Sequence, residues 1–200
     1  MKLILSKIKT YFGKLDKLLL FMCMGIACFA VFIQYTLYEN DISSAVTASQ
    51  YKTQIIAFIA GLVIAMALAA INYKYLAKLW FIYVPLAMGL TLLLFTPLGI
   101  QREGADDIGW LDLGIMTIQP SEILKLAFIL SLAVHLSKVE DRMNEPIHFI
   151  LLCIHGAIPT LLIRQTGDDG SALVFLFIFI CMMFAAGLSW KYLVMIAVAI

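Results

Sequence analysis

Long apolar runs divide this sequence, and they constrain its fold more than any other feature. About 20 consecutive apolar residues cross the ~30 Å hydrocarbon core of a bilayer as a helix. Of the 200 residues, 63% are hydrophobic and 14% are charged, whereas soluble domains average about 45–50% and about 25%. We therefore expect an all-α, polytopic transmembrane helix bundle. Its predicted complete spans are Leu18–Leu37, Ile55–Ile71, Leu79–Phe95, Pro120–Leu136, Ile147–Ile163 and Ser171–Leu188.

The two ends of the sequence differ in character. Residues 1–17 are rich in lysine and are predicted to be a basic cytoplasmic segment, with the first span acting as the insertion signal. The run Tyr192–Ile200 is apolar but too short to cross a bilayer. It is interpreted as the start of a seventh span, which suggests a truncated chain. Residues 1–200 are accordingly expected to belong to a single membrane domain.

Basic residues set the predicted orientation, because short cytoplasmic loops carry an excess of lysine and arginine. One set of span ends carries ten basic residues, whereas the other carries only Lys52, Arg102 and Arg164. The N-terminus is therefore predicted to be cytoplasmic, and loops 101–113 and 164–170 to face outward. A net charge of +1 gives no surplus for binding nucleic acid. The basic residues of the cytoplasmic set are Lys2, Lys7, Lys9, Lys14, Lys17, Lys74, Lys78, Lys138, Arg142 and Lys191.

Charged residues at the outer end of the fourth span are the strongest functional candidates. An ionisable side chain inside the bilayer costs at least ~2.5–3.5 kcal/mol on insertion scales, so it is a functional candidate by default. Glu122 and Lys125 are three residues apart and share one face of a helix. On the predicted topology, Arg164 and Asp168 lie on the same outer side. The sequence thus predicts a polar cluster there.

Structural roles remain open for the same residues. Glu122 lies in a first helical turn, where a carboxylate favours the helix dipole and can bond back to the Gln119 amide. Asp168 or Asp169 would cap the sixth helix in a similar way. Lys125 could act only as the counter-ion of Glu122.

No residue spacing indicates a metal site. The cysteines lie in apolar runs without a C-x-x-C pattern, which favours packing. No cofactor is evident, and the use of a divalent cation is left open. Three histidines on apolar helices have no visible second ligand and are interpreted as packing or interface residues: His135, His148 and His155.

Several motifs, in order, resemble those of the SEDS family (shape, elongation, division and sporulation), which includes FtsW, RodA and SpoVE. The run 119–122 followed by Lys125 is similar to the family's Q-P-S-E-x-x-K signature. The run 168–174 resembles its P-D-x-G-[ST]-A-L segment, and the agreement covers about residues 15–200. Gly109 stands where the family has arginine, and Gly167 where proline is usual.

The resemblance implies a peptidoglycan glycosyltransferase that polymerises lipid II into glycan strands at the outer face of the bacterial cytoplasmic membrane. It also implies ten spans, a class B penicillin-binding transpeptidase as partner, other divisome or elongasome membrane proteins, and a catalytic aspartate beyond residue 200. The resemblance carries over Glu122, Lys125 and Asp168 as supporting catalytic residues. Candidate substrate-binding residues are Gln119, Ser121, Arg164 and Asp169.

Two other functions fit the same residues. A lipid II flippase would use the polar cluster as a substrate path, and broken helices at the midplane would favour it. A non-catalytic scaffold is expected if the chain ends at residue 200. In a scaffold, Glu122 and Lys125 would tolerate neutral substitution.

Overall fold

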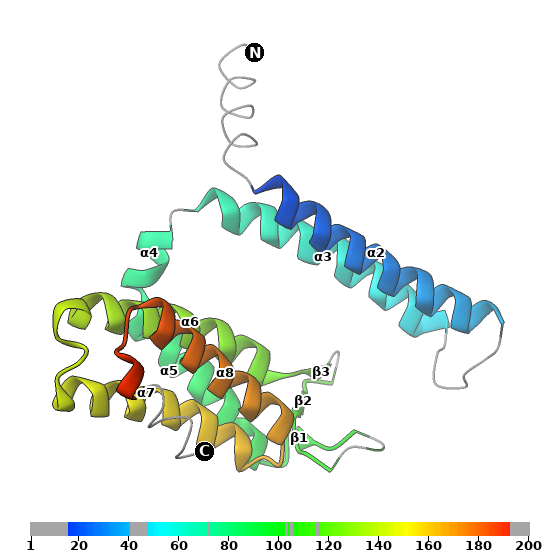
Figure 1. Ribbon diagram of the computed structural model, residues 1–200. Helices are drawn as coiled ribbons and strands as arrows, with labels where there is room; N and C mark the ends of the chain where they lie inside the picture. The colour runs from blue at the N-terminus through cyan, green and yellow to red at the C-terminus, as the bar shows by residue number, and fades with distance from the viewer. Residues whose placement is uncertain are drawn as a thin grey trace. The chain divides into compact units, whose positions relative to one another are not determined.

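The computed structural model of this chain describes residues 16–40, 48–71, 73–102, 104, 106–114 and 117–192. These residues are mostly helical (Figure 1). They divide into two compact units, Met1–Asn72 and Tyr73–Ile200. Nearly all of the basic segment 1–17 and of the run 192–200 lies outside the described residues. So do Glu103 and Ala105 of the loop 101–113, which is predicted to face outward and is called the outer loop below. The single membrane domain stays a prediction.

The first unit is a pair of apolar helices, α2 (Lys17–Glu39) and α3 (Ala48–Ala70), that lie side by side (Figure 1). Asp16 caps α2, because its carboxylate accepts a hydrogen bond from the Leu19 amide at 3.0 Å. The rings of Tyr35 and Tyr51 join the two helices, with centroids 5.7 Å apart. No residue of α2 is buried against the other described residues.

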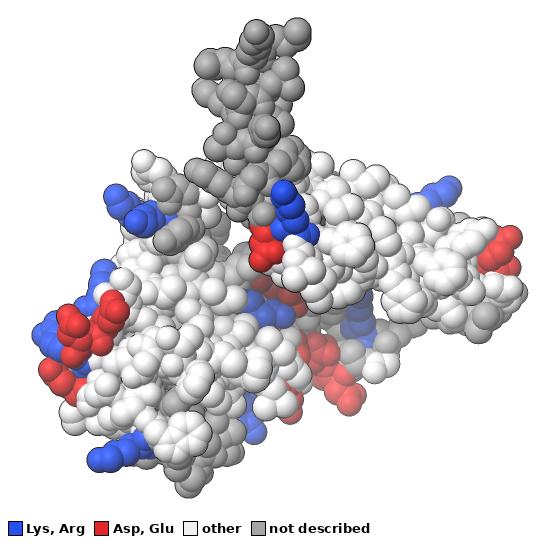
Figure 2. All heavy atoms as spheres, turned by 45° about the horizontal axis from the view of Figure 1, so that its top comes forward, with Lys and Arg blue, Asp and Glu red and all other residues white. Residues whose placement is uncertain are grey.

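Three helices among the described residues are long and apolar enough to cross a membrane: Lys17–Glu39, Gln50–Ala70 and Pro146–Arg164. Two shorter apolar helices are Trp80–Phe95 and Asp169–Ala185. Figure 2 shows charged side chains in small groups, with wide areas between them that carry no charged residue. The prediction of a predominantly helical membrane protein is thereby confirmed, while the count of six spans stays a prediction.

The second unit is built around α6 (Pro120–Val139), which contacts the three other long helices. Its buried side chains Leu124, Phe128, Leu132 and Leu136 recur every fourth residue and form one apolar stripe. Pro120 occupies the first helical turn, as the sequence predicts. The remaining helices of this unit are α4 (Tyr73–Lys78), α5 (Trp80–Leu92), η1 (Leu93–Phe95), η2 (Glu140–Arg142), α7 (Pro146–Arg164) and α8 (Asp169–Ala185).

The polar loop before α6 folds into a small antiparallel sheet, which an all-α prediction does not include. Its strands are β1 (Gly99–Ile100), β2 (Trp110–Asp112) and β3 (Thr117–Ile118). Leu111 on the central strand pairs with both neighbours and is fully buried. Strands of two or three residues are too short to show an alternating pattern in the sequence. Its last strand, β3, leads directly into the first turn of α6.

Contact between α7 and α8 depends on Gly156. A Cβ atom at this position would lie 2.7 Å from a ring carbon of the buried Phe179. We expect Gly156→Ala to lower stability by about 1–3 kcal/mol, the usual cost of overpacking a core, measured as a lower melting temperature. Gly89→Ala in α5 is the matched control, since a Cβ there meets nothing within 4 Å. Equal melting temperatures for the two variants would contradict this packing.

Candidate functional site

A carboxylate and an ammonium group meet at the first turns of α6. Glu122 Oε1 accepts a hydrogen bond from Lys125 Nζ at 2.6 Å. The Lys125 side chain is 17% exposed and that of Glu122 is 60% exposed. The aliphatic stem of the lysine is therefore covered, while the carboxylate remains accessible. We call these two residues the α6 pair.

The α6 pair decides between two roles for Glu122. The Glu122 carboxylate accepts a hydrogen bond from Lys125 and not from the Gln119 amide. A capping box therefore does not account for the position of Glu122. Position in the first turn still favours its charge, because the N-terminus of a helix carries a partial positive charge. Beside it, Ser121 is buried and its Oγ has no hydrogen-bond partner among the described residues.

Asp168 connects the turn between α7 and α8 to the start of α6. Its Oδ1 accepts a hydrogen bond from the Ser171 amide at 2.7 Å, which caps α8. Its Oδ2 accepts a longer bond of 3.5 Å from the side-chain amide of Gln119. The capping role left open by the sequence therefore belongs to Asp168, which also has a contact across the site.

Gly167 gives this turn its backbone conformation. Its φ is +86°, in the left-handed region where proline, locked near −65°, cannot lie. Glycine has no Cβ atom and adopts this conformation without steric cost. A Cβ at Gly167 would lie 3.3 Å from Cα of Asp107, so the outer loop approaches this turn closely.

The outer loop itself is the third segment at this end of the molecule. The Ile108 amide donates a hydrogen bond to the Thr166 carbonyl at 2.9 Å. Nearby, the guanidinium carbon of Arg102 lies 3.4 Å from the centroid of the Trp110 ring, a stacked cation–π contact. In this chain, therefore, a guanidinium group from Arg102 lies against the tryptophan that follows Gly109.

The predicted polar cluster is split into separate pairs. Arg164 Nε lies 3.6 Å from Asp169 Oδ1, with the side chains 71% and 77% exposed. Such an exposed pair contributes only about 0–1 kcal/mol, so its guanidinium is free to exchange partners. Among the described residues no ion pair joins it to the α6 pair. The bond between Gln119 and Asp168 is what links the two helix ends.

This end of the molecule can bind anions and position carboxylates. An ammonium group has three N–H donors, and Lys125 uses one on Glu122. The remaining donors and the exposed Arg164 are suited to phosphate oxygens. The described residues contain no group of three His, Cys, Asp or Glu side chains placed to hold a metal ion.

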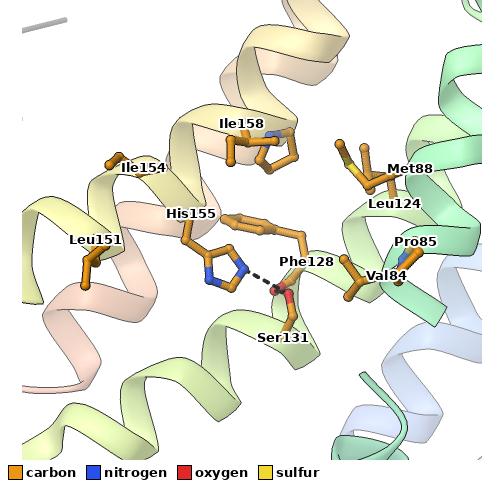
Figure 3. A pocket seen from close by; sticks show the side chains of 11 residues that line it. Val84, Pro85, Met88, Leu124, Phe128, Ser131, Leu151, Ile154, His155 and Ile158 are labelled. Atoms are coloured by element: carbon orange, nitrogen blue, oxygen red, sulfur yellow. Dashed lines mark hydrogen bonds between the residues drawn. The ribbon is translucent and has the colours of Figure 1, made fainter. Parts of the chain in front are cut away.

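The sequence analysis did not predict a polar contact between the helices α6 and α7. The Nδ1 atoms of His135 on α6 and His155 on α7 lie 3.0 Å apart, and His155 Nε2 lies 3.0 Å from Ser131 Oγ. Figure 3 shows this second contact beside the Phe128 ring. The only signal in the sequence was the spacing of Ser131 and His135, four apart on one helix face.

One choice of tautomers satisfies all of these hydrogen bonds together. Ser131 Oγ donates its proton to the Phe128 carbonyl at 3.1 Å, so toward His155 it acts as the acceptor. His155 therefore carries its proton on Nε2 and presents a free lone pair on Nδ1. That lone pair accepts from the Nδ1–H of His135. The three side chains form one directed chain of hydrogen bonds.

Removing one histidine should leave the other unpaired. We expect His155→Leu to cost about 1–2 kcal/mol, because the His135 Nδ1–H then lacks an acceptor in an apolar setting. A melting curve in detergent measures the loss. His148→Leu on the same helix is the control, since His148 Nδ1 is buried without a partner among the described residues and Nε2 has only a 3.6 Å contact with the exposed Glu145. A larger loss for the control would contradict the hydrogen-bond chain.

An apolar hollow of about 450 Å³ lies beside this chain, between α5, α6 and α7 (Figure 3). Met88 comes from α5, Leu124 and Phe128 from α6, and Ile158 from α7. Ser131 and His155 are its polar residues. The hollow thus follows α6 from its middle toward the α6 pair.

Residues 14–200 match the FtsW/RodA/SpoVE family, described as cell cycle proteins. The chain is 31% identical to a probable peptidoglycan glycosyltransferase FtsW of Geobacter sp. (strain M18), over 89% of this chain and 49% of that protein. It is 27% identical to peptidoglycan glycosyltransferase MrdB of Escherichia coli (strain K12), over 92% and 47%. The chain thus spans about half the length of these relatives.

Solved structures share the fold. A chain from the work "Structural coordination of polymerization and crosslinking by a peptidoglycan synthase complex" superposes with a TM-score of 0.75 at 24% identity, covering 93% of this chain and 52% of that one. RodA of Thermus thermophilus gives a TM-score of 0.63 at 25% identity, covering 87% and 58%. The described helices therefore have a RodA-like arrangement.

Proposed function

This chain belongs to the FtsW/RodA/SpoVE family of cell cycle proteins, and from that membership we propose that it forms part of a peptidoglycan glycosyltransferase. The reaction is the polymerisation of lipid II into glycan strands at the outer face of the cytoplasmic membrane. Relatives named peptidoglycan glycosyltransferase support this activity. The observation that carries the proposal is the α6 pair, a partly covered ammonium held by a carboxylate beside the Asp168 turn.

The chemistry requires a base and cations. A sugar hydroxyl attacks the anomeric carbon of the donor, the bond to the lipid diphosphate breaks, and the hydroxyl proton passes to a base. Negative charge develops on the departing diphosphate, and preorganised cations lower its energy in the transition state. We assign the base to a residue beyond position 200, in accordance with the family resemblance.

Within residues 1–200, the proposed roles follow from charge and contact. Lys125 and Arg164 stabilise the diphosphate, Lys125 from a partly covered position and Arg164 from the surface. Glu122 orients the Lys125 ammonium through their 2.6 Å hydrogen bond. Asp168 holds the start of α8 against Gln119. Ser121, whose hydroxyl has no partner among the described residues, and Asp169 are proposed to contact the sugar or phosphate groups.

The proposed membrane arrangement has six complete spans in one multi-pass domain, with a cytoplasmic N-terminus. The three helices long and apolar enough to cross a membrane support it, together with the two shorter apolar helices. The central helix α6 would then be the remaining span, entered from the outer side at Pro120. That orientation places the α6 pair at the outer face, where glycan strands are made.

A class B penicillin-binding transpeptidase is the proposed partner, together with other membrane proteins of cell elongation or division. Support comes from the shared fold with a chain of a peptidoglycan synthase complex, whose description joins polymerization with crosslinking. A polymerase that releases uncrosslinked strands needs such a crosslinking enzyme nearby.

Purified full-length protein reconstituted in vesicles with labelled lipid II tests the proposed activity. We expect glycan polymer to appear on a gel in a time-dependent manner. Movement of lipid II between leaflets without polymer would identify a flippase instead. Absence of both activities, with the protein folded and supplied with its transpeptidase, would favour a scaffold.

A further inference from the structure

Three lysines surround one hollow at the opposite end of α6. Lys74 and Lys78 come from α4 and Lys138 from the last turn of α6, and together they line a groove of about 600 Å³. Ser137 and Trp80 line it as well. Its apolar walls include Leu130 and Val134 of α6. We call this feature the basic groove.

Contacts within the protein do not account for all of this charge. Lys138 Nζ lies 5.7 Å from the centroid of the Trp80 ring, and Lys78 Nζ lies 6.0 Å from that of Tyr75. In the part of the chain that the structure describes, no carboxylate lies within ion-pair distance of Lys78 or Lys138. Position at a helix C-terminus favours each of these lysines separately. It does not explain why ammonium groups from two helices, which repel one another, are held around a shared hollow.

The basic groove is remote from the α6 pair. Lys138 follows Lys125 by 13 positions on one helix, which corresponds to roughly 20 Å at 1.5 Å per residue. Its lysines belong to the set that the positive-inside rule assigns to the cytoplasm. Trp80 has the amphipathic ring that is enriched at membrane interfaces. The groove therefore lies at the level of the inner headgroups, facing away from the side proposed for polymerisation.

We propose that the basic groove binds the headgroup of an anionic phospholipid from the cytoplasmic leaflet. Clusters of Lys and Arg next to membrane helices attract anionic lipids, and basic pockets between helices hold their phosphates. The ammonium groups of Lys78 and Lys138 donate hydrogen bonds to the phosphate oxygens, and the Ser137 hydroxyl donates a further one. Leu130 and Val134 contact the glycerol and the first acyl carbons. A soluble anion would meet the same charges but would leave these walls uncovered.

Native mass spectrometry of the full-length protein, titrated with phosphatidylglycerol or with phosphatidylethanolamine of the same acyl chains, tests the proposal. We expect the anionic lipid to be retained preferentially. Each lysine replaced by glutamine should weaken retention about fivefold, and the K78Q/K138Q variant roughly 25-fold, as the contribution of one basic residue near an anionic membrane implies. Lys191→Gln is the matched control, because this exposed lysine of the same predicted side does not line the groove.

Two further variants test whether lipid binding requires the open space of the groove in addition to its positive charge. K78R/K138R keeps both charges and should retain the lipid. Ala133→Phe keeps all three lysines but fills the groove at one of its lining residues, and it should weaken retention. Unchanged binding in K78Q/K138Q or in Ala133→Phe, or displacement of the lipid by millimolar inorganic phosphate, would overturn the proposal. So would equal retention of the two lipids by the wild-type protein.

Discussion

Lys125→Ala, made in the full-length protein, is expected to reduce glycan polymerisation by about 10²–10³-fold, the loss typical when one group that stabilises developing charge is removed. The ammonium group is partly covered and held by Glu122, so solvent cannot replace it at the same place. Folding should survive, because the Glu122 carboxylate left behind is 60% exposed and remains hydrated. Polymer yield from purified lipid II measures the effect.

The control for this variant removes a similar charge elsewhere. Lys52 is exposed on α3 and is predicted to lie on the outer side, so Lys52→Ala should polymerise at the wild-type rate. Both variants should reach the membrane in equal amounts, as measured by quantitative blotting. Normal polymerisation by Lys125→Ala would remove this lysine from the proposed site.

Asp168 is expected to have two separable roles. Its Oδ1 caps α8 and its Oδ2 bonds to Gln119. Asn is as good a helix cap as Asp, so Asp168→Asn should keep the melting temperature but lose the negative charge. Asp168→Ala removes the cap as well and should cost about 0.5–2 kcal/mol of stability. Both variants should lower polymerisation at least tenfold if the charge acts in the site.

Comparison of the two variants distinguishes the roles. Activity that falls only in Asp168→Ala, in proportion to its loss of stability, would reduce Asp168 to a structural cap. Measurement below the melting temperature of the weaker variant removes the effect of unfolded protein. The Gln119 contact can be tested in the same series, because Gln119→Ala removes the 3.5 Å bond and leaves the cap of α8 intact.

The helices of this fold could be predicted because long apolar runs mark them and prolines mark where two of them begin. Pro120 begins α6 and Pro146 begins α7, each one at the first turn, where proline is favoured. The small sheet could not be predicted, because its strands have two or three residues and depend on pairing across the loop. Leu111 is fully buried by that pairing, but nothing in its local sequence distinguishes it from other loop residues.

The site was predictable where its residues share one helix and less so where they do not. Glu122 and Lys125 form the ion pair that their spacing indicates. His135 and His155 are 20 positions apart on two helices, and only the packing of α6 against α7 brings them together. Apolar surroundings made each of them resemble an isolated packing residue in the sequence.

The main alternative for the α6 pair is that Lys125 serves only to neutralise Glu122. The polymer yield of E122Q/K125M, compared with that of each single variant and of the wild-type protein, tests this most directly. Both charges disappear together in the double variant, so a mere counter-ion is no longer needed there. We predict that E122Q/K125M stays as inactive as K125M, because the lipid diphosphate has lost its cation. Recovery of polymerisation to the wild-type level in the double variant would contradict a direct role for Lys125 in glycan synthesis.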